Sequence, residues 1–371
     1  MLSEIDRPEN AVSTFSMRGP VRIPRYEITE IVDNETVPDK SLRSYTFPDH
    51  PRYQIPIQII QQFKRYEEFL LNNETFFVNR TISFKPTTHG LGNKLHGLHS
   101  ALFFAMVTHR RLCICDWPEF SQLFYFTFNV PLLNSSDYRC QSRIVESYVK
   151  PQNDLLFQRP VREFLGDGTI LFTSNMDCLR ILQYNNYYRR LMKSFGFGRG
   201  FLPISDFSVI FKHYIYHKVM LPQPVIRRKI ELEYNSWMNC VYIGIHIRTG
   251  DYLVGLGTLN LLYSRNTSVL LMIQHAMNLT KISPFPVKWF LCTDNSVLKL
   301  DLLQSYPHHI ITYSSTIAHT GSNNNTLSTG ISDAIIEMYL LGKCNYLITS
   351  LYSTFSENAY SIAGIVPQVI R

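Results

Sequence analysis

The sequence lacks several motifs that would assign it to a metal-dependent class of protein. It has no D-x-D pair, so it gives no sign of a site that chelates Mg²⁺ through neighbouring carboxylates. It has no C-x-x-C, and Cys113 and Cys115 are too close together to form a zinc hairpin. No internal repeat is visible. We therefore expect a globular protein whose functional site holds no metal ion.

The sequence also lacks long apolar runs and long basic runs. No apolar stretch reaches the ~18 residues of a membrane span, and no signal peptide opens the chain. The net charge of +7 is mildly basic, but lysine and arginine occur only in isolated pairs and in the triplet Arg227-Arg228-Lys229. A nucleic-acid groove is therefore not indicated, whereas the charge suits a small anionic ligand.

N-glycosylation sequons, in contrast, are numerous. They favour a secretory lumen, although no membrane anchor is visible in the chain. Either the protein is cytosolic, or the chain is part of a protein whose anchor lies upstream, and we favour the second interpretation. The candidate acceptors are Asn34, Asn73, Asn79, Asn134, Asn266, Asn278 and Asn324.

The chain has seven cysteines, an odd number that leaves at least one thiol free. Cys292 and Cys344 lie in apolar, strand-like runs and are typical of small core residues. We predict a disulfide between Cys140 and Cys178.

The length of 371 residues predicts two domains of ordinary size, and 45% hydrophobic with 18% charged residues is typical of a globular protein. Residues 1–55 are polar and contain many prolines, so we expect a stem or a loosely packed extension there. Residues 56–235 are predicted to form an N-terminal domain that includes the acceptor side, although residues 116–235 are aromatic-rich and irregular. Residues 236–371 are predicted to form the second domain.

The first domain is predicted to start with a helix over 57–71, a strand over 81–84, a glycine turn, a helix over 91–106 and a strand over 111–115. Gly90 and Gly92 lie in the strand-to-helix turn, where backbone N–H groups can approach a ligand. The turn is not a Walker loop, and Leu95 stands where the dinucleotide fingerprint has glycine. A simple tight turn is the alternative interpretation.

Three histidines, His89, His96 and His99, follow this turn and raise the question of a metal site. No carboxylate joins them at ligand spacing, and a zinc site needs three or four matched ligands. We expect His96 and His99 to lie on a solvated face or on a face where their hydrogen bonds are satisfied.

From Val241 onward, strands alternate with helices, which predicts a parallel doubly wound sheet. The expected strands cover 241–247, 287–292, 310–313, 346–349 and 366–370. The expected helices lie near 268–280, 296–304, 332–343 and 356–364.

Polar residues follow three of these strands, where open α/β sheets bind their ligands. They are Arg248 and Asp251, Thr293-Asp294, and Thr349-Ser350 leading into Ser353-Thr354-Phe355-Ser356. An arginine keeps its charge and suits a phosphate, and the last segment opens a helix whose free N–H groups bind anions. A structural pair of Arg248 with Asp251, and an ordinary helix cap at Ser353, are the alternatives.

These segments resemble the fucosyltransferases. Gly90-Leu-Gly-Asn-Lys94 is similar to the G-L-G-N entry of that superfamily, and His246-Ile-Arg248 with Asp251 resembles the H-x-R-x-x-D motif of its α1,2-, α1,6- and protein O-fucosyltransferases. The block from Glu337 to Phe355 is similar to that of plant xyloglucan fucosyltransferases. The resemblance covers residues 85–115 and 241–366.

The resemblance implies a GT-B fold, with two Rossmann-like domains facing across a cleft, and an inverting Golgi enzyme that uses GDP-fucose without a metal or other cofactor. It implies that Arg248 contacts the diphosphate, and that Glu337 accepts hydrogen bonds from the N–H edge of guanine. The other donor-binding residues would be Gly90, Gly92, Asn93, Asp294, Ser353, Thr354 and Phe355.

Three positions depart from single branches of the superfamily. Thr249 stands where the α1,6 branch has a second arginine, Glu337 where some branches have aspartate, and His246 where the plant group usually has glutamine. The acceptor, a glycan or glycoprotein, therefore cannot be inherited from any one branch.

For catalysis we expect Asp251 to take the proton of the acceptor hydroxyl, or else to hold Arg248, and His246 to orient its neighbours. An inactive nucleotide- or carbohydrate-binding protein of the same fold, or a sulfotransferase-like enzyme, is the alternative function.

Overall fold

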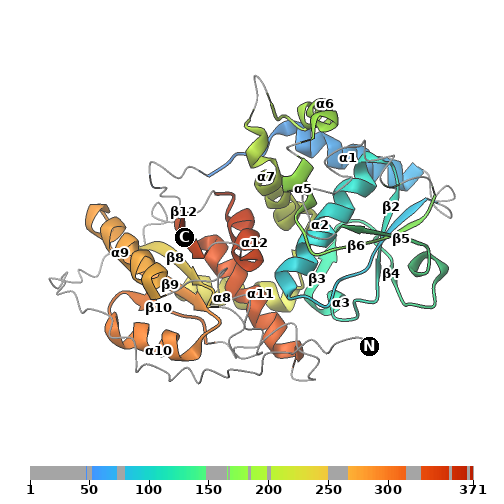
Figure 1. Ribbon diagram of the computed structural model, residues 1–371. Coiled ribbons are helices and arrows are strands. Elements are labelled where there is room, and N and C mark those ends of the chain that lie inside the picture. The colour runs from blue at the N-terminus through green and yellow to red at the C-terminus, as the bar shows by residue number, and fades with distance from the viewer. Residues whose placement is uncertain are drawn as a thin grey trace, which may run out of the picture. The chain divides into compact units, whose positions relative to one another are not determined.

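Two parallel sheets, one in each half of the chain, organise the fold in the computed structural model (Figure 1). Residues 34–371 form one compact unit that contains both sheets. We call residues 52–236 the N-terminal half and residues 241–370 the C-terminal half. The structure describes residues 47, 52–72, 80–147, 165, 168–182, 185–198, 202–249, 266–314, 327–350, 353–365 and 368–370.

The sheet of the N-terminal half has the strand order β4-β2-β1-β6-β5, with every pair parallel. Its three central strands are short and buried, which suits the apolar composition of a parallel sheet covered on both faces. The strands are β1 (Thr81–Phe84), β2 (Arg111–Cys115), β4 (Leu132–Leu133), β5 (Arg143–Ser147) and β6 (Ile170–Ser174).

The sheet of the C-terminal half has the order β10-β9-β8-β11-β12, again fully parallel. Numbered along the chain this is 3-2-1-4-5, the doubly wound order, and the direction of winding reverses between β8 and β11. The predicted fold class is therefore confirmed. The strands are β8 (Val241–Ile247), β9 (Val287–Thr293), β10 (Ile310–Ile311), β11 (Tyr346–Ser350) and β12 (Gln368–Ile370).

The helices that the apolar spacing predicted are present with similar bounds. Helix α2 is buried on nearly all sides, because it packs on β1 and β6 with one side and on α12 with the other. The confirmed helices are α1 (Ile57–Asn72), α2 (Leu91–Val107), α9 (Asn266–Ile282), α10 (Ser296–Ser305), α11 (Leu327–Lys343) and α12 (Thr354–Ala363).

The middle of the chain, which showed no regular pattern, folds into short elements around an aromatic cluster. Phe103 of α2 lies 5.5 Å, ring centre to ring centre, from both Phe207 and Phe211. The elements are α3 (Phe120–Leu123), β3 (Phe124–Phe126), η3 (Tyr138–Cys140), α5 (Cys178–Leu182), η5 (Asn186–Tyr188), α6 (Arg189–Ser194), η6 (Ile204–Asp206), α7 (Phe207–Tyr214), the π-helical turn η7 (Ile215–Val219), β7 (Met220–Pro222) and α8 (Pro224–Ser236).

Helix α12 joins the two halves of the chain. In its middle, buried Asn358 donates to the carbonyl of Gly92 at 3.1 Å and accepts from the hydroxyl of Tyr216 at 2.6 Å. At its end, His213 donates to the carbonyl of Ile362 at 3.0 Å, and His217 donates to the same oxygen at 2.9 Å. These contacts satisfy a carbonyl that a helix end leaves without an intrahelical partner.

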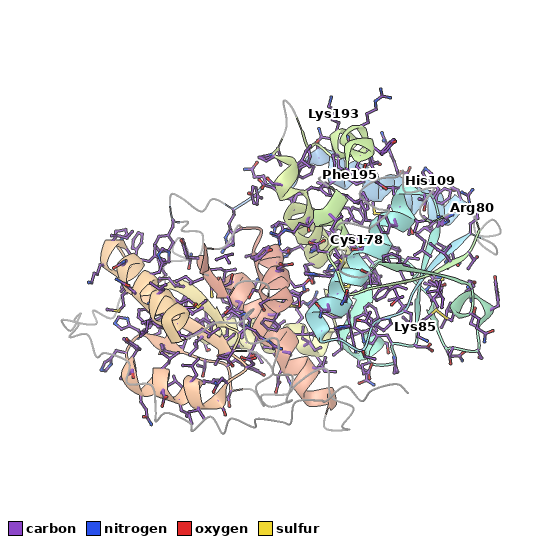
Figure 2. The ribbon with its side chains drawn as sticks, viewed as in Figure 1. Arg80, Lys85, His109, Cys178, Lys193 and Phe195 are labelled. Carbon is purple, nitrogen blue, oxygen red and sulfur yellow. A yellow bond between two sulfur atoms is a disulfide. The ribbon has the colours of Figure 1, made fainter. Side chains whose placement is uncertain are left out.

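The disulfide prediction is wrong. Cys140 forms a disulfide with Cys115 at the end of β2, and Cys178 is a buried cysteine outside that disulfide at the start of α5 (Figure 2). The sequence does not identify Cys115 as the partner, because Cys115 lies in an apolar, strand-like segment. The packing of η3 against the sheet brings Cys140 to the end of that strand.

The predicted domain boundaries at 55 and 235 stay predictions, and most of the expected stem lies outside the described residues. No helix in the described part of the chain is long and apolar enough to cross a membrane.

Candidate active site

Three strand ends of the C-terminal sheet lie side by side, as the sequence predicted. Ile247 of β8 pairs with Thr293 of β9, and His246 pairs with Thr349 of β11. The residues that follow, at 248, 294 and 350, are therefore neighbours at the carboxyl edge of the sheet. This edge lies at the reversal between β8 and β11, where doubly wound sheets bind ligands.

Arg248 is held by Asp294 at this edge. The Nε atom of Arg248 lies 3.3 Å from Oδ2 of Asp294, and 28% of the arginine side chain is exposed. The Oδ1 atom of Asp294 accepts from the backbone N–H of Thr249 at 2.9 Å and from its hydroxyl at 3.0 Å. The guanidinium is thus positioned by one carboxylate while part of it can still reach a ligand. Asp251 lies outside the described residues.

Ser350 connects the two strands at the reversal point. Its Oγ accepts from the backbone N–H of Arg248 at 2.8 Å and donates to the carbonyl of His246 at 3.3 Å. This places the start of the Arg248 segment against the segment that leads into α12.

The first turn of α12 contains the predicted hydroxyl cluster. Ser353 is the N-cap and accepts from the N–H of Ser356. The hydroxyl of Ser356 is hydrogen-bonded to Nδ1 of His246 at 2.6 Å, and the ring of Phe355 stacks on the same imidazole at 4.9 Å. His246 therefore fixes the first turn of α12 to the end of β8.

His246 is neutral at pH 7. Burial lowers its pKa to about 4; the charge of Asp294 opposes this shift, and that of Arg248 adds to it. An imidazole with this pKa and this hydrogen bond is suited to orient its neighbours.

The glycine turn of the N-terminal half contacts the same helix. A β-carbon at Gly92 would lie 2.6 Å from Oγ1 of Thr354 and 2.7 Å from its carbonyl carbon. Gly92 is therefore required for the close approach of α2 and α12, a packing role that the motif alone did not reveal. Gly90 is the N-cap of α2, and the backbone N–H of Asn93 donates to the carbonyl of Gly90 at 3.0 Å.

Glu337, the predicted guanine contact, is half-buried in α11. It lies close enough to Cys292 of β9 that its charge, second to burial, raises the pKa of that thiol. It does not line the pocket described next.

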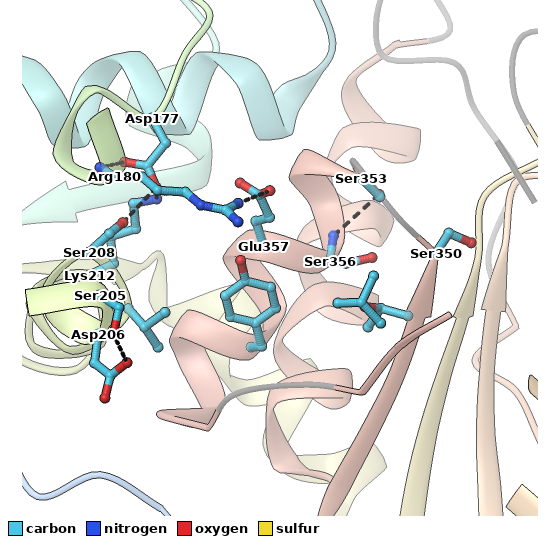
Figure 3. Close-up of a pocket in the computed structure, with 14 residues that line it drawn as sticks. Asp177, Arg180, Ser205, Asp206, Ser208, Lys212, Ser350, Ser353, Ser356 and Glu357 are labelled. Carbon is cyan, nitrogen blue, oxygen red and sulfur yellow. Dashed lines mark hydrogen bonds and ion pairs between the residues drawn. The ribbon is translucent and has the colours of Figure 1, made fainter. Parts of the chain in front are cut away.

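A pocket of about 390 Å³ opens beside the strand ends (Figure 3). Ser350, Ser353, Ser356 and Glu357 line one side of it. The other side comes from the segment after β6 and from η6 and α7, where the sequence analysis identified no site residue. Its main polar members are Asp177, Arg180, Ser205, Asp206, Ser208 and Lys212.

The far wall contains a buried ion pair. Lys212, only 1% exposed, bonds to Oδ2 of Asp177, which also accepts from the hydroxyl of Ser208. Burial raises the pKa of Asp177, but the charge of Lys212 and these two hydrogen bonds outweigh it, so the net pKa is lower than usual. This carboxylate stays ionised.

His96 and His99 are buried, not solvated as one alternative had it. Burial lowers the pKa of His96 to about 3 and that of His99 well below its usual value. Both ring nitrogens of His99 and Nε2 of His96 lack a hydrogen-bond partner. The alternative prediction, a face on which the hydrogen bonds of these histidines are satisfied, is therefore wrong as well. Within the described ranges, no group of three His, Cys, Asp or Glu side chains could hold a metal ion.

Two of the predicted glycosylation acceptors, Asn134 and Asn278, are exposed. The side chain of Asn266 is not described, and Asn34, Asn73, Asn79 and Asn324 lie outside the described residues.

The comparisons with known proteins agree with the fold and the motifs. Residues 211–370, from α7 to β12, match the family NodZ, nodulation protein Z. No curated protein matches the chain significantly.

Among solved structures, an arginine-to-lysine mutant of Arabidopsis thaliana FUT1 in complex with GDP is 15% identical, with 85% of this chain and 80% of that chain covered and a TM-score of 0.62. NodZ α-1,6-fucosyltransferase soaked with GDP-fucose is 20% identical, covering 76% of this chain and 92% of its own, with a TM-score of 0.47. Fucosyltransferase NodZ from Bradyrhizobium is 19% identical over the same shares, with a TM-score of 0.44. The match to FUT1 shows a shared fold, and the match to the NodZ family overlaps the segment where the sequence resembles fucosyltransferases.

Proposed function

We propose that this protein is an inverting, metal-independent fucosyltransferase that moves fucose from GDP-fucose to a hydroxyl of a glycan or glycoprotein. The match of residues 211–370 to NodZ, a protein named as an α-1,6-fucosyltransferase, supports this activity. FUT1, whose fold this chain shares, is described in complex with GDP.

The observation that carries the proposal is the convergence of Arg248 with the start of α12. The bond from the backbone N–H of Arg248 to Ser350 Oγ, at 2.8 Å, and the bond between His246 and Ser356, at 2.6 Å, hold the end of β8, which leads into Arg248, beside the first turn of α12. A diphosphate is the ligand that suits both, because guanidinium forks and free helix N–H groups each bind phosphate oxygens.

The same groups can stabilise the reaction. When the bond between the fucose anomeric carbon and the phosphate oxygen breaks, negative charge develops on GDP. In the proposal, Arg248 and the oriented N–H groups of Thr354 and Phe355 stabilise that charge, in the role that a metal ion plays in other transferases. Glu337 remains the proposed guanine contact.

The proposed compartment is the Golgi or another secretory lumen. The Cys115–Cys140 disulfide supports it, because disulfides persist in oxidising compartments. The exposed sequons at Asn134 and Asn278 are accessible to a glycosylation enzyme.

The test combines binding with turnover. The purified protein is titrated with GDP and with an adenine nucleotide, then incubated with GDP-fucose and a panel of glycans and peptides, with and without EDTA. We expect GDP binding and fucosylated product, unchanged by EDTA. GDP binding without turnover would indicate an inactive binding protein, preference for the adenine nucleotide a sulfotransferase-like enzyme, and strong inhibition by EDTA a metal-dependent mechanism.

A further inference from the structure

Glu357 occupies a distinctive position in the pocket. It lies one helical turn after Ser353 on α12, so the two side chains share a face of the helix, and both line the pocket. A group at Glu357 is therefore next to whatever occupies the phosphate site at the start of α12. Glu357 plays no part in the donor site described above.

The two carboxylate oxygens of Glu357 have different surroundings. Oε1 accepts from Nη1 of Arg180 at 3.1 Å, and Figure 3 shows these side chains pointing toward each other from α12 and α5. Oε2 lies 3.6 Å from Nε2 of His96, which is buried in α2. With 17% of the side chain exposed, the carboxylate is held from behind and open to the pocket in front.

The pair with Arg180 does not explain why a carboxylate is buried here. Arg180 is 59% exposed, and ion pairs with an exposed partner contribute only about 0–1 kcal/mol to stability. His96 supplies no counter-charge, because burial lowers its pKa to about 3. Lys212 also favours the charged form of Glu357, but it is already paired with Asp177. A partly buried carboxylate whose own ion pair is this weak is typical of a functional residue.

The charges around Glu357 suit a proton acceptor. Burial raises the pKa of Glu357. The charges of Lys212 and Arg180 oppose this rise, and the charge of Asp177 adds to it. Tyr360, on the same helix, lies close enough to Glu357 that the charge of Glu357, second to burial, raises the pKa of the tyrosine. A carboxylate whose pKa is raised toward the working pH is a stronger base than an ordinary one.

We propose that Glu357 is the catalytic base that accepts the proton of the acceptor hydroxyl, an inference that rests on the proposed fucosyl transfer. The hydroxyl oxygen forms a bond to the anomeric carbon of fucose as the bond from that carbon to the phosphate oxygen breaks. The electron pair of the broken bond leaves with GDP, and the hydroxyl proton moves to Glu357. His96 and Arg180 are positioning residues for the carboxylate.

The spacing along α12 is suitable for this step. A base lies about 2.6–3.2 Å from the hydroxyl, and the hydroxyl lies about 3–3.5 Å from the carbon that it attacks. Together these two distances put the carboxylate at most ~7 Å from the anomeric carbon. Ser353 and Glu357 are four residues apart on the helix, so their Cβ atoms are separated by about 5–6 Å. A diphosphate at Ser353 therefore leaves room for a sugar carbon and a hydroxyl before Glu357.

The side chains on the pocket wall opposite Glu357 indicate which chemical class of acceptor would bind there. Ser205, Asp206 and Asp177 line that wall with a hydroxyl group and two carboxylates, which together can donate and accept hydrogen bonds. Such a surface suits a neutral sugar that carries several hydroxyl groups, and the acceptor hydroxyl would be presented from this side.

The experiment uses Glu357→Gln and Glu357→Ala in the full chain. We expect Glu357→Gln to lower kcat for transfer by about 10²–10⁴, with GDP affinity within twofold of the wild type. Sodium azide, a nucleophile with no proton to lose, should restore GDP release from GDP-fucose in Glu357→Ala and give fucosyl azide. A residue with a merely structural role would show no such rescue.

Two control variants make the result specific. Glu231→Gln, on an exposed surface of α8, should change neither transfer nor binding. Asp251→Ala tests the base expected from the sequence. The assignment is overturned if Glu357→Gln keeps more than about a tenth of the wild-type rate, if azide fails to rescue Glu357→Ala, or if azide rescues Asp251→Ala instead. Absence of GDP-fucose turnover by the wild type would contradict the proposed function itself.

Discussion

Arg248 and Asp294, at the ends of adjacent strands, approach to 3.3 Å between Nε and Oδ2. The same carboxylate accepts two hydrogen bonds from Thr249, so it is fixed before any ligand arrives. The arginine is thus held in position by a group that does not enclose it. The Arg248–Asp251 pair considered from sequence stays a prediction, because Asp251 lies outside the described residues.

Replacing Arg248 with alanine or lysine should reduce fucosyl transfer at least tenfold. A hydrogen bond to a charged group contributes about 1.5–3 kcal/mol, and lysine cannot reproduce the two-pronged contact of a guanidinium. GDP affinity measured by titration calorimetry should fall, while the thermal midpoint changes little. Arg227→Ala, an exposed control, should leave both unchanged. A large loss of stability with Arg248→Ala would favour a structural role.

Gly92→Ala should destabilise the protein by about 1–3 kcal/mol, the usual cost of overpacking. The added methyl would lie 2.6 Å from Oγ1 of Thr354 and 2.7 Å from backbone, so α2 and α12 would have to separate. Thr354→Ala should not rescue it, because the backbone contact remains. Denaturant unfolding of both variants checks this, and full rescue would contradict it.

The disulfide predicts a definite count of reactive thiols. After unfolding without reduction, alkylation should label five cysteines, and seven after reduction. Removing the bridge with Cys115→Ala and Cys140→Ala should cost about 3 kcal/mol of stability. Mass spectrometry and denaturant unfolding measure the two effects. A Cys178-containing crosslink would contradict the assignment.

Mild acid should destabilise the folded protein. Burial lowers the pKa of His246 and His213 to about 4 and that of His96 to about 3, whereas unfolded histidine titrates near 6.5. As pH falls from about 6.5 to 5, the unfolded chain binds protons that the folded chain does not, and each histidine removes up to about 1.4 kcal/mol per pH unit.

Glu357 acts in the opposite direction, because its pKa is raised and it favours the folded state as pH falls. One carboxyl does not offset three histidines. Denaturant midpoints measured between about pH 7.5 and pH 5 should decrease with acid. A flat profile would contradict this, because it would show that these imidazoles titrate over the same pH range in the folded and unfolded chains.

The sheet of the C-terminal half could be predicted because its signals are local. A run such as Val241–Ile247 is apolar and β-rich over its full length, and the winding rule then places residues 248, 294 and 350 at one edge. The contact of Arg248 with Ser350 followed from that placement.

The opposite wall of the pocket could not be predicted in this way. Asp177 follows β6, a strand the sequence analysis did not identify, and Lys212 lies in the eight-residue helix α7, too short for a clear periodic signal. Their pairing depends on long-range packing of an aromatic-rich segment. Glu357 had a usable signal, because a carboxylate four residues after the cap Ser353 must lie on the same helical face.

Helix α12 has contacts with the N-terminal half at its middle, through Asn358 with Gly92, and at its end, through His213 and His217 with Ile362. A hinge motion that pulled the halves apart at this helix would break all of these bonds together. We therefore expect these contacts of α12 to stay intact while GDP leaves and GDP-fucose binds through the solvent-exposed opening of the pocket. A crosslink between α2 and α12 should therefore slow turnover little, whereas a crosslink across the opening of the pocket should slow it strongly.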